Sequence, residues 1–312
     1  MPQLTSCQLP TTPIDDAPSW PRSFHVYLNE PLDQRPAGSV GKCGECRLSF
    51  SAKSGKTRLQ HTFVSHPFHL THPWYLDAAL PDMAVVYVQT PAGGFIQGDR
   101  ARLCFTLDSA AQVHITTQAA EKIHTMTANC ALQDISFALE AGAYAEYCPE
   151  PTILFPGSRF GQQLQIQLGA AASIFLADIF LAYPSANGST FDALTTSLRV
   201  TDDNGSLLVR DHSLVLPAHC STTGPGILAQ HHVWGQAFLI GPRVPAVWAR
   251  EVHEQLSSEP HTACGTTLLP QDRGLCVKVV GTDVRAVRRV LHLARHQLRL
   301  SHLGVPAIQF LK

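Results

Sequence analysis

The stretch AYAEYCPEPTILFPGSRF, residues 143–160, carries two acidic side chains in a setting that suits cation binding. Glu146 and Glu150 flank a cysteine, and the prolines on both sides of Glu150 force its backbone to be extended. A carboxylate held among apolar neighbours is costly unless it has a partner. The stretch therefore indicates either a carboxylate that meets a cation or a strand end with an exposed acid.

A second candidate is the glycine-rich segment TPAGGFIQGDR, residues 90–100. Its glycines do not form the GxGxxG pattern, and a strand rather than a helix follows, so no helix N-terminus is available to bind a phosphate. A wide turn with positive φ angles explains the glycines. It leaves Asp99 unexplained, because this acid is held directly beside them.

Motifs for nucleotide hydrolysis and for the common hydrolases are missing. SAKSGKT, residues 51–57, ends like a phosphate-binding loop, but the first glycine of that motif would fall on Phe50. Neither HExxH nor GxSxG occurs. The sequence therefore contains none of these motifs that would indicate a hydrolase.

Cys43 and Cys46 form a single CxxC motif, CGEC. A tetrahedral zinc site needs two more ligands, and four histidines downstream are candidates at irregular spacing: His61, His66, His69 and His72. A surface loop with two thiols is the alternative. A redox pair is disfavoured, because the motif runs into a strand and does not open a helix.

The composition is that of a globular chain with few charges. Of the 312 residues, 45% are hydrophobic and 15% are charged, and the net charge of −1 argues against nucleic acid as the main ligand. Nine scattered cysteines fit a reducing compartment. No secretory signal is visible, and the longest apolar run, residues 170–183, is interrupted by Asp178. We therefore expect a soluble cytoplasmic protein.

Short alternating segments follow a proline-rich lead, residues 1–40, which we expect to be extended or disordered. LDSAAQVHI, LEAGAYAEY and LGAAASIFL begin at Leu107, Leu139 and Leu168, and each is typical of a strand, a tight turn and a second strand. A repeat of about thirty residues indicates stacked hairpins. The predicted fold is mainly β: a single domain, residues 41–312, built as a layered or superhelical array of antiparallel strands and hairpins with about two α-helices.

The two helices are expected at residues 244–256 and 282–304, the second near the C-terminus with its N-cap within the Thr-Asp pair at 282–283. A hairpin is expected at Asn204-Gly205. The second helix has a basic face that is either solvated or in contact with an acidic partner. The candidate partner-binding residues on it are Arg285, Arg288, Arg289 and Arg295.

Five segments, taken in order, resemble the urease accessory protein family UreD, also called UreH. They are LTHPWY, residues 85–124 from VVYVQT to EKIH, AEYCPEPTILFPGSRF, DDNGSLLVRD and CVKVVGTDVRAVRRVLHLARHQLR. Order and spacing agree over residues 46–303, and the turn Gly-Gly-x-x-x-Gly-Asp followed by TTQAAEKIH is the most specific match. The resemblance implies a mainly β array with a couple of helices.

The resemblance also implies a non-enzymatic chaperone that binds the urease apoprotein with UreF and the GTPase UreG and passes nickel through an internal tunnel. No tightly bound cofactor is implied, only transient Ni²⁺. Because the ion must be handed on, its ligands should be exchangeable oxygen or imidazole groups. The candidate residues of this nickel route are Asp99, Glu121, Glu146, Glu150 and Asp178, with Thr116, Thr117 and His124 in support.

Two alternatives stay open at this point. The first is a hydrolase of unknown substrate that uses Glu150 with His124 or with a metal ion. The second is a zinc-stabilised binding module built on Cys43 and Cys46.

Overall fold

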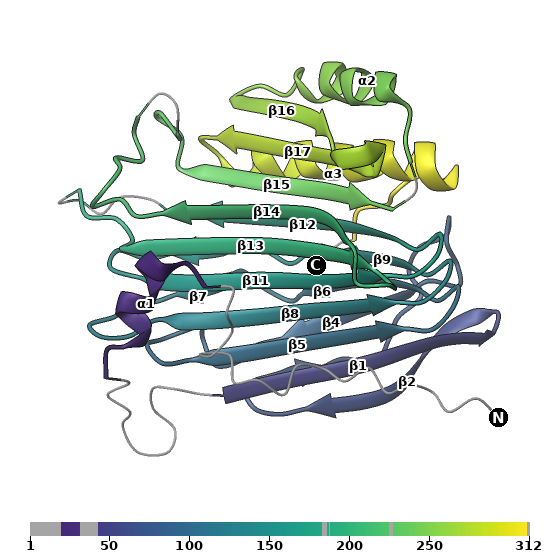
Figure 1. Cartoon of the computed structure of the whole chain (residues 1–312), viewed down its shortest axis with the longest axis horizontal. Coiled ribbons are helices and arrows are strands. Elements are labelled where there is room, and N and C mark those ends of the chain that lie inside the picture. The colour runs from purple at the N-terminus through teal and green to yellow at the C-terminus, as the bar shows by residue number, and fades with distance from the viewer. Residues whose placement is uncertain are drawn as a thin grey trace.

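Two β-sheets packed face to face form the body of the protein (Figure 1). The structure is a computed structural model that describes residues 20–31, 43–182, 186, 188–224, 227–241 and 243–310. Sheet A has seven strands: β1 (Cys43–Ser54), β2 (Lys56–Val64), β5 (Arg100–Leu107), β8 (Ala131–Leu139), β11 (Arg159–Leu168), β13 (Ala193–Asp202) and β14 (Leu207–Val215).

Sheet B has ten strands. They are β3 (His69–Leu70), β4 (Ala84–Gln89), β6 (Gln112–Thr117), β7 (Glu121–Ile123), β9 (Tyr144–Tyr147), β10 (Thr152–Leu154), β12 (Ser173–Leu181), β15 (Val233–Ile240), β16 (Thr262–Leu268) and β17 (Gly274–Gly281). The helices are α1 (Arg22–Leu28), α2 (Ala246–Leu256) and α3 (Val284–Leu303), with a 3₁₀ turn at Pro270–Asp272. The fold is therefore mainly β, as the sequence predicts, with one long helix near the C-terminus.

The long strands in the middle of the chain alternate between the two sheets. In sheet A, β5 pairs with β8, β8 with β11 and β11 with β13, and all of these pairs are parallel. In sheet B the parallel series is β4, β6, β9 and β12. Each coil of chain thus adds one strand to each sheet, as in a solenoid.

The repeat seen in the sequence is one coil of this solenoid. Leu107 pairs with Leu139, and Leu139 pairs with Leu168, so the three repeats stack in register. The tight turn after each leucine has a residue with positive φ at the same position: Ala110, Gly142 and Ala171. These turns pass from sheet A to sheet B.

The prediction of antiparallel hairpins is therefore wrong for the central strands. A period of about thirty residues shows that a unit recurs, but it does not show whether the two strands of a unit pair with each other or with the next unit. Antiparallel pairs occur towards the sheet edges, between β1 and β2, β3 and β4, β12 and β15, β15 and β17, and β16 and β17. The hairpin expected at Asn204-Gly205 joins β13 and β14, and Gly205 adopts a φ of 81°.

Three helices pack on the outer faces of the sheets, where about two were expected. Helix α1 lies inside the lead that was expected to be extended or disordered, because Trp20 and Phe24 pack against Leu132 and Ala193 of sheet A. The remainder of that lead, residues 1–19 and 32–40, lies outside the described residues.

Helix α3 packs on the outer face of sheet B and begins as predicted. The side chain of Asp283 accepts a hydrogen bond from the backbone N–H of Arg285, as an N-cap does. Val287, Leu291 and Leu298 of α3 are buried against strands β12, β15 and β17. No helix within the described ranges combines the length and the hydrophobicity needed to cross a bilayer.

Two glycines of the glycine-rich turn differ in how closely other backbone atoms approach them. Gly93 and Gly94 adopt φ angles of 81° and 124°, but a Cβ on Gly93 would meet no atom within 4 Å, whereas one on Gly94 would lie 2.3 Å from the carbonyl oxygen of Lys122. We expect Gly93→Ala to lower the free energy of unfolding by about 1–2 kcal/mol. Gly94→Ala should lower it by about 1–3 kcal/mol more, because the backbone must also shift. Urea denaturation measures both, and equal losses would contradict the close approach.

Candidate functional site

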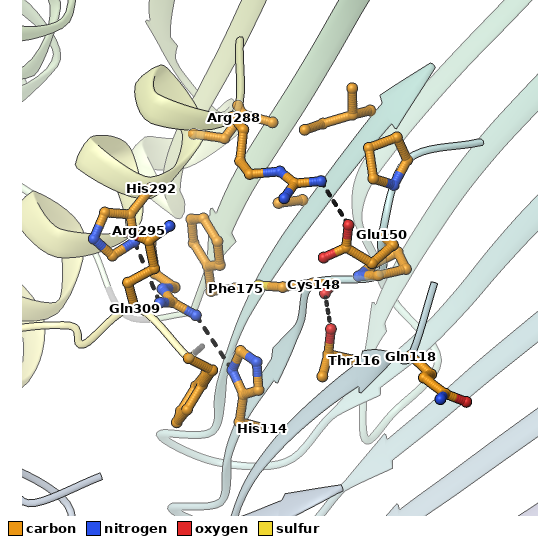
Figure 2. Close-up of a pocket in the computed structure, with 16 residues that line it drawn as sticks. His114, Thr116, Gln118, Cys148, Glu150, Phe175, Arg288, His292, Arg295 and Gln309 are labelled. Carbon is orange, nitrogen blue, oxygen red and sulfur yellow. Dashed lines mark hydrogen bonds and ion pairs between the residues drawn. The ribbon is translucent and has the colours of Figure 1, made fainter. Parts of the chain in front are cut away.

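A cavity of about 330 Å³ lies between helix α3 and the outer face of sheet B (Figure 2). Residues of β6 and β12 line it from the sheet, and residues between β9 and β10, on α3 and in the C-terminal segment line the remaining sides. Its polar lining includes His114, Thr116, Cys148, Glu150, Arg288, His292 and Arg295. Several of the residues singled out in the sequence therefore meet at one place.

Strand periodicity explains which side chains face this cavity. Side chains along a strand alternate between the two faces of a sheet. Val113 and Ile115 of β6 lie in the core between the sheets, so His114 and Thr116 point to the outer face. Glu146 of β9 lies on the same outer face, since it contacts His114.

Glu146 is the centre of a buried network of charges beneath α3. It has no exposed surface. Its carboxylate accepts hydrogen bonds from His114 Nδ1 at 2.6 Å and from the Tyr144 hydroxyl at 2.8 Å. The guanidinium groups of Arg295 and Arg299 each approach it to 3.5 Å. Four groups on β6, β9 and α3 thus converge on one carboxylate.

The network also reaches the segment before β4. Arg299 Nη1 donates a hydrogen bond of 2.7 Å to Asp77, whose side chain is buried. Burial raises the pKa of Glu146, but Arg295, His114 and Arg299 outweigh it, so the pKa is lowered to about 2. The two carboxylates and the two guanidinium groups balance in charge and join α3 to sheet B.

Glu150 and Arg288 form an ion pair at the side of the cavity (Figure 2), with 2.5 Å between Arg288 Nη2 and Glu150 Oε2. The backbone N–H of Glu150 donates to Thr117 Oγ1 at 2.8 Å. The hydroxyl of Thr116 donates to the carbonyl of Cys148 at 2.6 Å. The two threonines thus hold the Pro-Glu-Pro segment to the end of β6.

The C-terminal segment covers the other side of the network. Arg295 Nη2 donates to the carbonyl of Ile308. The ring of Phe310 lies 4.5 Å from the ring of His114 and 5.7 Å from the Arg295 guanidinium, measured between ring centres and to the guanidinium carbon. The segment therefore excludes water from Glu146.

Asp178 lies on the other face of sheet B, between the two sheets. Its neighbours of the same parity on β12, Leu176 and Phe180, are in the core between the sheets. Only 6% of Asp178 is exposed, and burial raises its pKa to about 7. It lines a small cavity with Thr196 and Gln236. Among the described residues, no hydrogen bond or ion pair compensates its charge.

Glu121 lies on β7 and is partly exposed. Ile123, two residues further along β7, is in the core, so Glu121 has the same inward parity. The pKa of Tyr147 is raised well above its usual value by burial and by the charges of Asp178 and Glu121. Two of the five predicted acids therefore act on one tyrosine between the sheets.

Asp99 and His124 belong to the glycine-rich turn itself. Asp99 accepts a hydrogen bond of 2.9 Å from the backbone N–H of Ile96. His124 Nε2 donates to the carbonyl of Gly93 at 3.0 Å, and its ring stacks on Phe155. Asp99 and His124 therefore both stabilise the turn through hydrogen bonds to its backbone, which gives the acid after the glycines a structural role.

The five acids predicted to line one nickel route are thus divided among three places. Glu146 and Glu150 lie on the outer face of sheet B, Asp178 and Glu121 lie between the sheets, and Asp99 closes its own turn. Within the described part of the chain, no group of three or more His, Cys, Asp or Glu side chains is arranged to hold a metal ion.

The four arginines predicted as a partner-binding face also have different surroundings. Arg285 and Arg288 are exposed, and Arg289 is exposed and paired with Glu259 at 2.6 Å. Arg295 is only 6% exposed, so its assignment to a partner contact is wrong. It belongs to the buried network around Glu146. Four further members of this network were not predicted from the sequence: Asp77, His114, Tyr144 and Arg299.

One pattern in the sequence could have revealed the buried arginines. Arg295 and Arg299 directly follow Ala294 and Leu298, which lie on the apolar face of α3, and they are four residues apart on one side of the helix. Charged residues at the edge of an apolar face imply buried partners.

The alternative zinc module is not supported by the positions of its cysteines. Cys43 and Cys46 lie in β1, and a separation of three residues places them on opposite faces of a strand. Cys43 is exposed and Cys46 is buried in the core. The two thiols therefore cannot bind the same ion.

The alternative hydrolase pair is not assembled either. His124 stacks on Phe155, just beyond β10, whereas Glu150 precedes β10 and pairs with Arg288. Five residues of extended chain correspond to roughly 16 Å. Glu150 and His124 are too far apart to act on one substrate atom.

Replacement of Glu146 by the isosteric Gln should strongly destabilise the folded protein. Glu146→Gln removes the charge that two buried guanidinium groups share, and we expect the free energy of unfolding to fall by about 3–5 kcal/mol. The matched control is Glu254→Gln, since Glu254 is exposed on α2. Its effect should stay within about 0.5 kcal/mol. Urea denaturation measures both, and a loss no larger for Glu146→Gln than for the control would rule out the anchoring role.

The raised pKa of Asp178 predicts that the stability of the folded protein depends on pH. Its pKa is about 7 in the folded protein, against an ordinary value of 3.8. Between these pH values only the folded state retains the proton, so the contribution of Asp178 to stability falls as pH rises from about 4 to about 7.

We therefore expect Asp178→Asn to match the wild type at pH 4 and to become more stable than it towards pH 8. The difference should grow by about 1.4 kcal/mol per pH unit between the two pKa values. Denaturation at a series of pH values measures it. Parallel stability curves for the two proteins would mean that Asp178 is solvated or compensated.

Comparison of the sequence with known proteins identifies a family. The sequence model of the family described as "UreD urease accessory protein" matches residues 42–310. A urease accessory protein UreD from Haloarcula marismortui is 31% identical over 287 residues, which cover 91% of this chain and 95% of that protein. A urease accessory protein UreD 2 from Streptomyces griseus is 32% identical over 280 residues, covering 88% of this chain and 95% of that protein.

A third relative, a urease accessory protein UreD from Photorhabdus laumondii, is 31% identical over 285 residues and is covered over 88% of its length. The resemblance inferred from short segments thus extends over nearly the whole chain, including the strands that carry Glu146 and Asp178. The chain belongs to the UreD urease accessory protein family.

Proposed function

We propose that the protein is a urease maturation scaffold that binds the urease apoprotein together with UreF and UreG and helps to deliver nickel to the urease active site. Family membership supports the link to urease. The observation that carries the nickel role is Asp178, a carboxylate held between two sheets with its charge uncompensated among the described residues.

The chemistry of the interior suits an ion that passes through. Ni²⁺ that must be released needs oxygen or imidazole ligands that exchange, because a closed thiolate cage would hold it too tightly. Asp178 offers a carboxylate, and Thr196 and Gln236 at the same small cavity offer a hydroxyl and an amide oxygen. Glu121, which is partly exposed on β7, provides a second acid whose charge acts on Tyr147. A divalent cation here would supply the charge that Asp178 lacks.

The outer surface supports the scaffold role. Arg285 and Arg289 project from the exposed side of α3, and Arg288 lies beside them above the cavity. Arginine is enriched at protein interfaces because its planar group binds carboxylates. We assign this side of α3 to contact with an acidic surface of a partner.

The nickel role predicts a specific defect in Asp178→Asn. This variant keeps the size of the side chain and removes its charge, so the fold and the partner surface should stay intact while nickel loading of co-expressed urease falls several-fold. Asp203→Asn is the matched control, because Asp203 is exposed in the loop between β13 and β14. Nickel per urease active site, urease activity and co-purification of the partners are measured together.

Glu150→Ala, measured in the same experiment, distinguishes the contribution of the outer face of sheet B to nickel loading from that of the inner face. If nickel follows the interior, Asp178→Asn lowers loading more than Glu150→Ala does, and both variants assemble. Normal loading by an assembled Asp178→Asn complex would disprove the interior route. Loss of co-purification with Asp178→Asn would instead show that this residue serves assembly.

A further inference from the structure

The cavity beneath α3 has no part in the proposed interior route, yet it is a formed site. Its volume of about 330 Å³ is within the range of small-molecule sites. Phe175, Ile179, Leu291 and Phe310 give it apolar walls. Such sites combine an apolar lining with a few fixed polar groups.

Hydrogen-bond donors outnumber acceptors in this lining. Glu146 cannot serve a ligand, because His114, Tyr144, Arg295 and Arg299 already surround its carboxylate. The guanidinium of Arg295 is also engaged within the protein, because its Nη1 faces His114 and Glu146 and its Nη2 donates to the carbonyl of Ile308. The guanidinium that can meet a ligand is therefore that of Arg288.

The charges at the cavity favour a ligand with a negative group. Two guanidinium groups, those of Arg288 and Arg295, line it, whereas Glu150 is the only acid in its lining among the residues that the structure describes. Arg288 contacts Glu150 through Nη2, the one polar contact found for this side chain, which leaves its other N–H groups for a second acceptor. His292 adds a neutral ring, because burial and the neighbouring Arg295 lower its pKa to about 4.

We propose that this cavity is a binding site for a small organic monocarboxylate. The carboxylate meets the N–H groups of Arg288 that Glu150 does not occupy, and the hydrocarbon body packs between Phe175 on β12 and Leu291 on α3. A guanidinium group pairs well with a planar carboxylate. The apolar walls favour a carboxylate with a hydrocarbon body over an inorganic anion.

Benzoate tests the proposal, with benzamide as a neutral ligand of the same shape. Isothermal titration of the full-length protein should show saturable binding of benzoate and binding of benzamide that is at least ten-fold weaker. Arg288→Gln should weaken benzoate binding at least ten-fold, because it removes the positively charged donor that meets the carboxylate. Arg285→Gln, on the solvent side of the same helix, should leave the affinity unchanged.

A second variant tests the cavity itself. Ala177 of β12 lines the floor, so Ala177→Leu should fill part of the volume and abolish benzoate binding. Thermal unfolding of each variant establishes that it is folded. The proposal is overturned if folded wild-type protein shows no saturable benzoate binding, if benzamide binds as tightly, or if Arg288→Gln and Ala177→Leu bind like the wild type.

Discussion

Parallel pairing between strands one coil apart is the constraint on which the rest of this structure depends. Because Leu107, Leu139 and Leu168 stack in register, each coil repeats the same inward and outward alternation of side chains. Even-numbered positions of β12 face the core, and even-numbered positions of β6 and β9 face α3. This parity puts Asp178 between the sheets and Glu146 beneath the helix, although both belong to sheet B.

The two carboxylates illustrate how surroundings decide the role of a buried acid. Glu146 is surrounded by donors and cations, and its pKa is about 2. Asp178 is buried without such compensation, and its pKa is about 7. The first is suited to hold α3 in place, because its charge is fully used within the protein. The second is suited to receive a cation from outside, because burial leaves its charge without a partner.

Local features of the fold were predictable from the sequence. Helix α2 lies within the predicted residues 244–256, Asp283 caps α3, and Gly205 turns between β13 and β14 as predicted, since each feature depends on a few neighbouring residues. The parallel pairing was not predictable, because a repeat does not specify its partner strand. The buried network joins residues as distant as Asp77 and Arg299, so neither residue type nor spacing indicated it.

In the candidate site, too, features set by neighbouring residues were predictable and contacts between distant residues were not. The Pro-Glu-Pro segment singled out Glu150, and the structure shows this acid paired with Arg288. The sequence offered no structural explanation for Asp99, because the hydrogen bond that it accepts from the backbone of Ile96 is not visible as a motif. Family resemblance supplied the link to urease, and the structure then separated the acids by face.

Anomalous X-ray scattering at the nickel absorption edge, on crystals of the protein purified with its partners and exposed to Ni²⁺, locates the ion in the structure. We expect a nickel peak between the two sheets within coordinating distance of the Asp178 carboxylate. Nickel bound only on the outer surface, with the interior around Asp178 empty of it, would disprove an interior route.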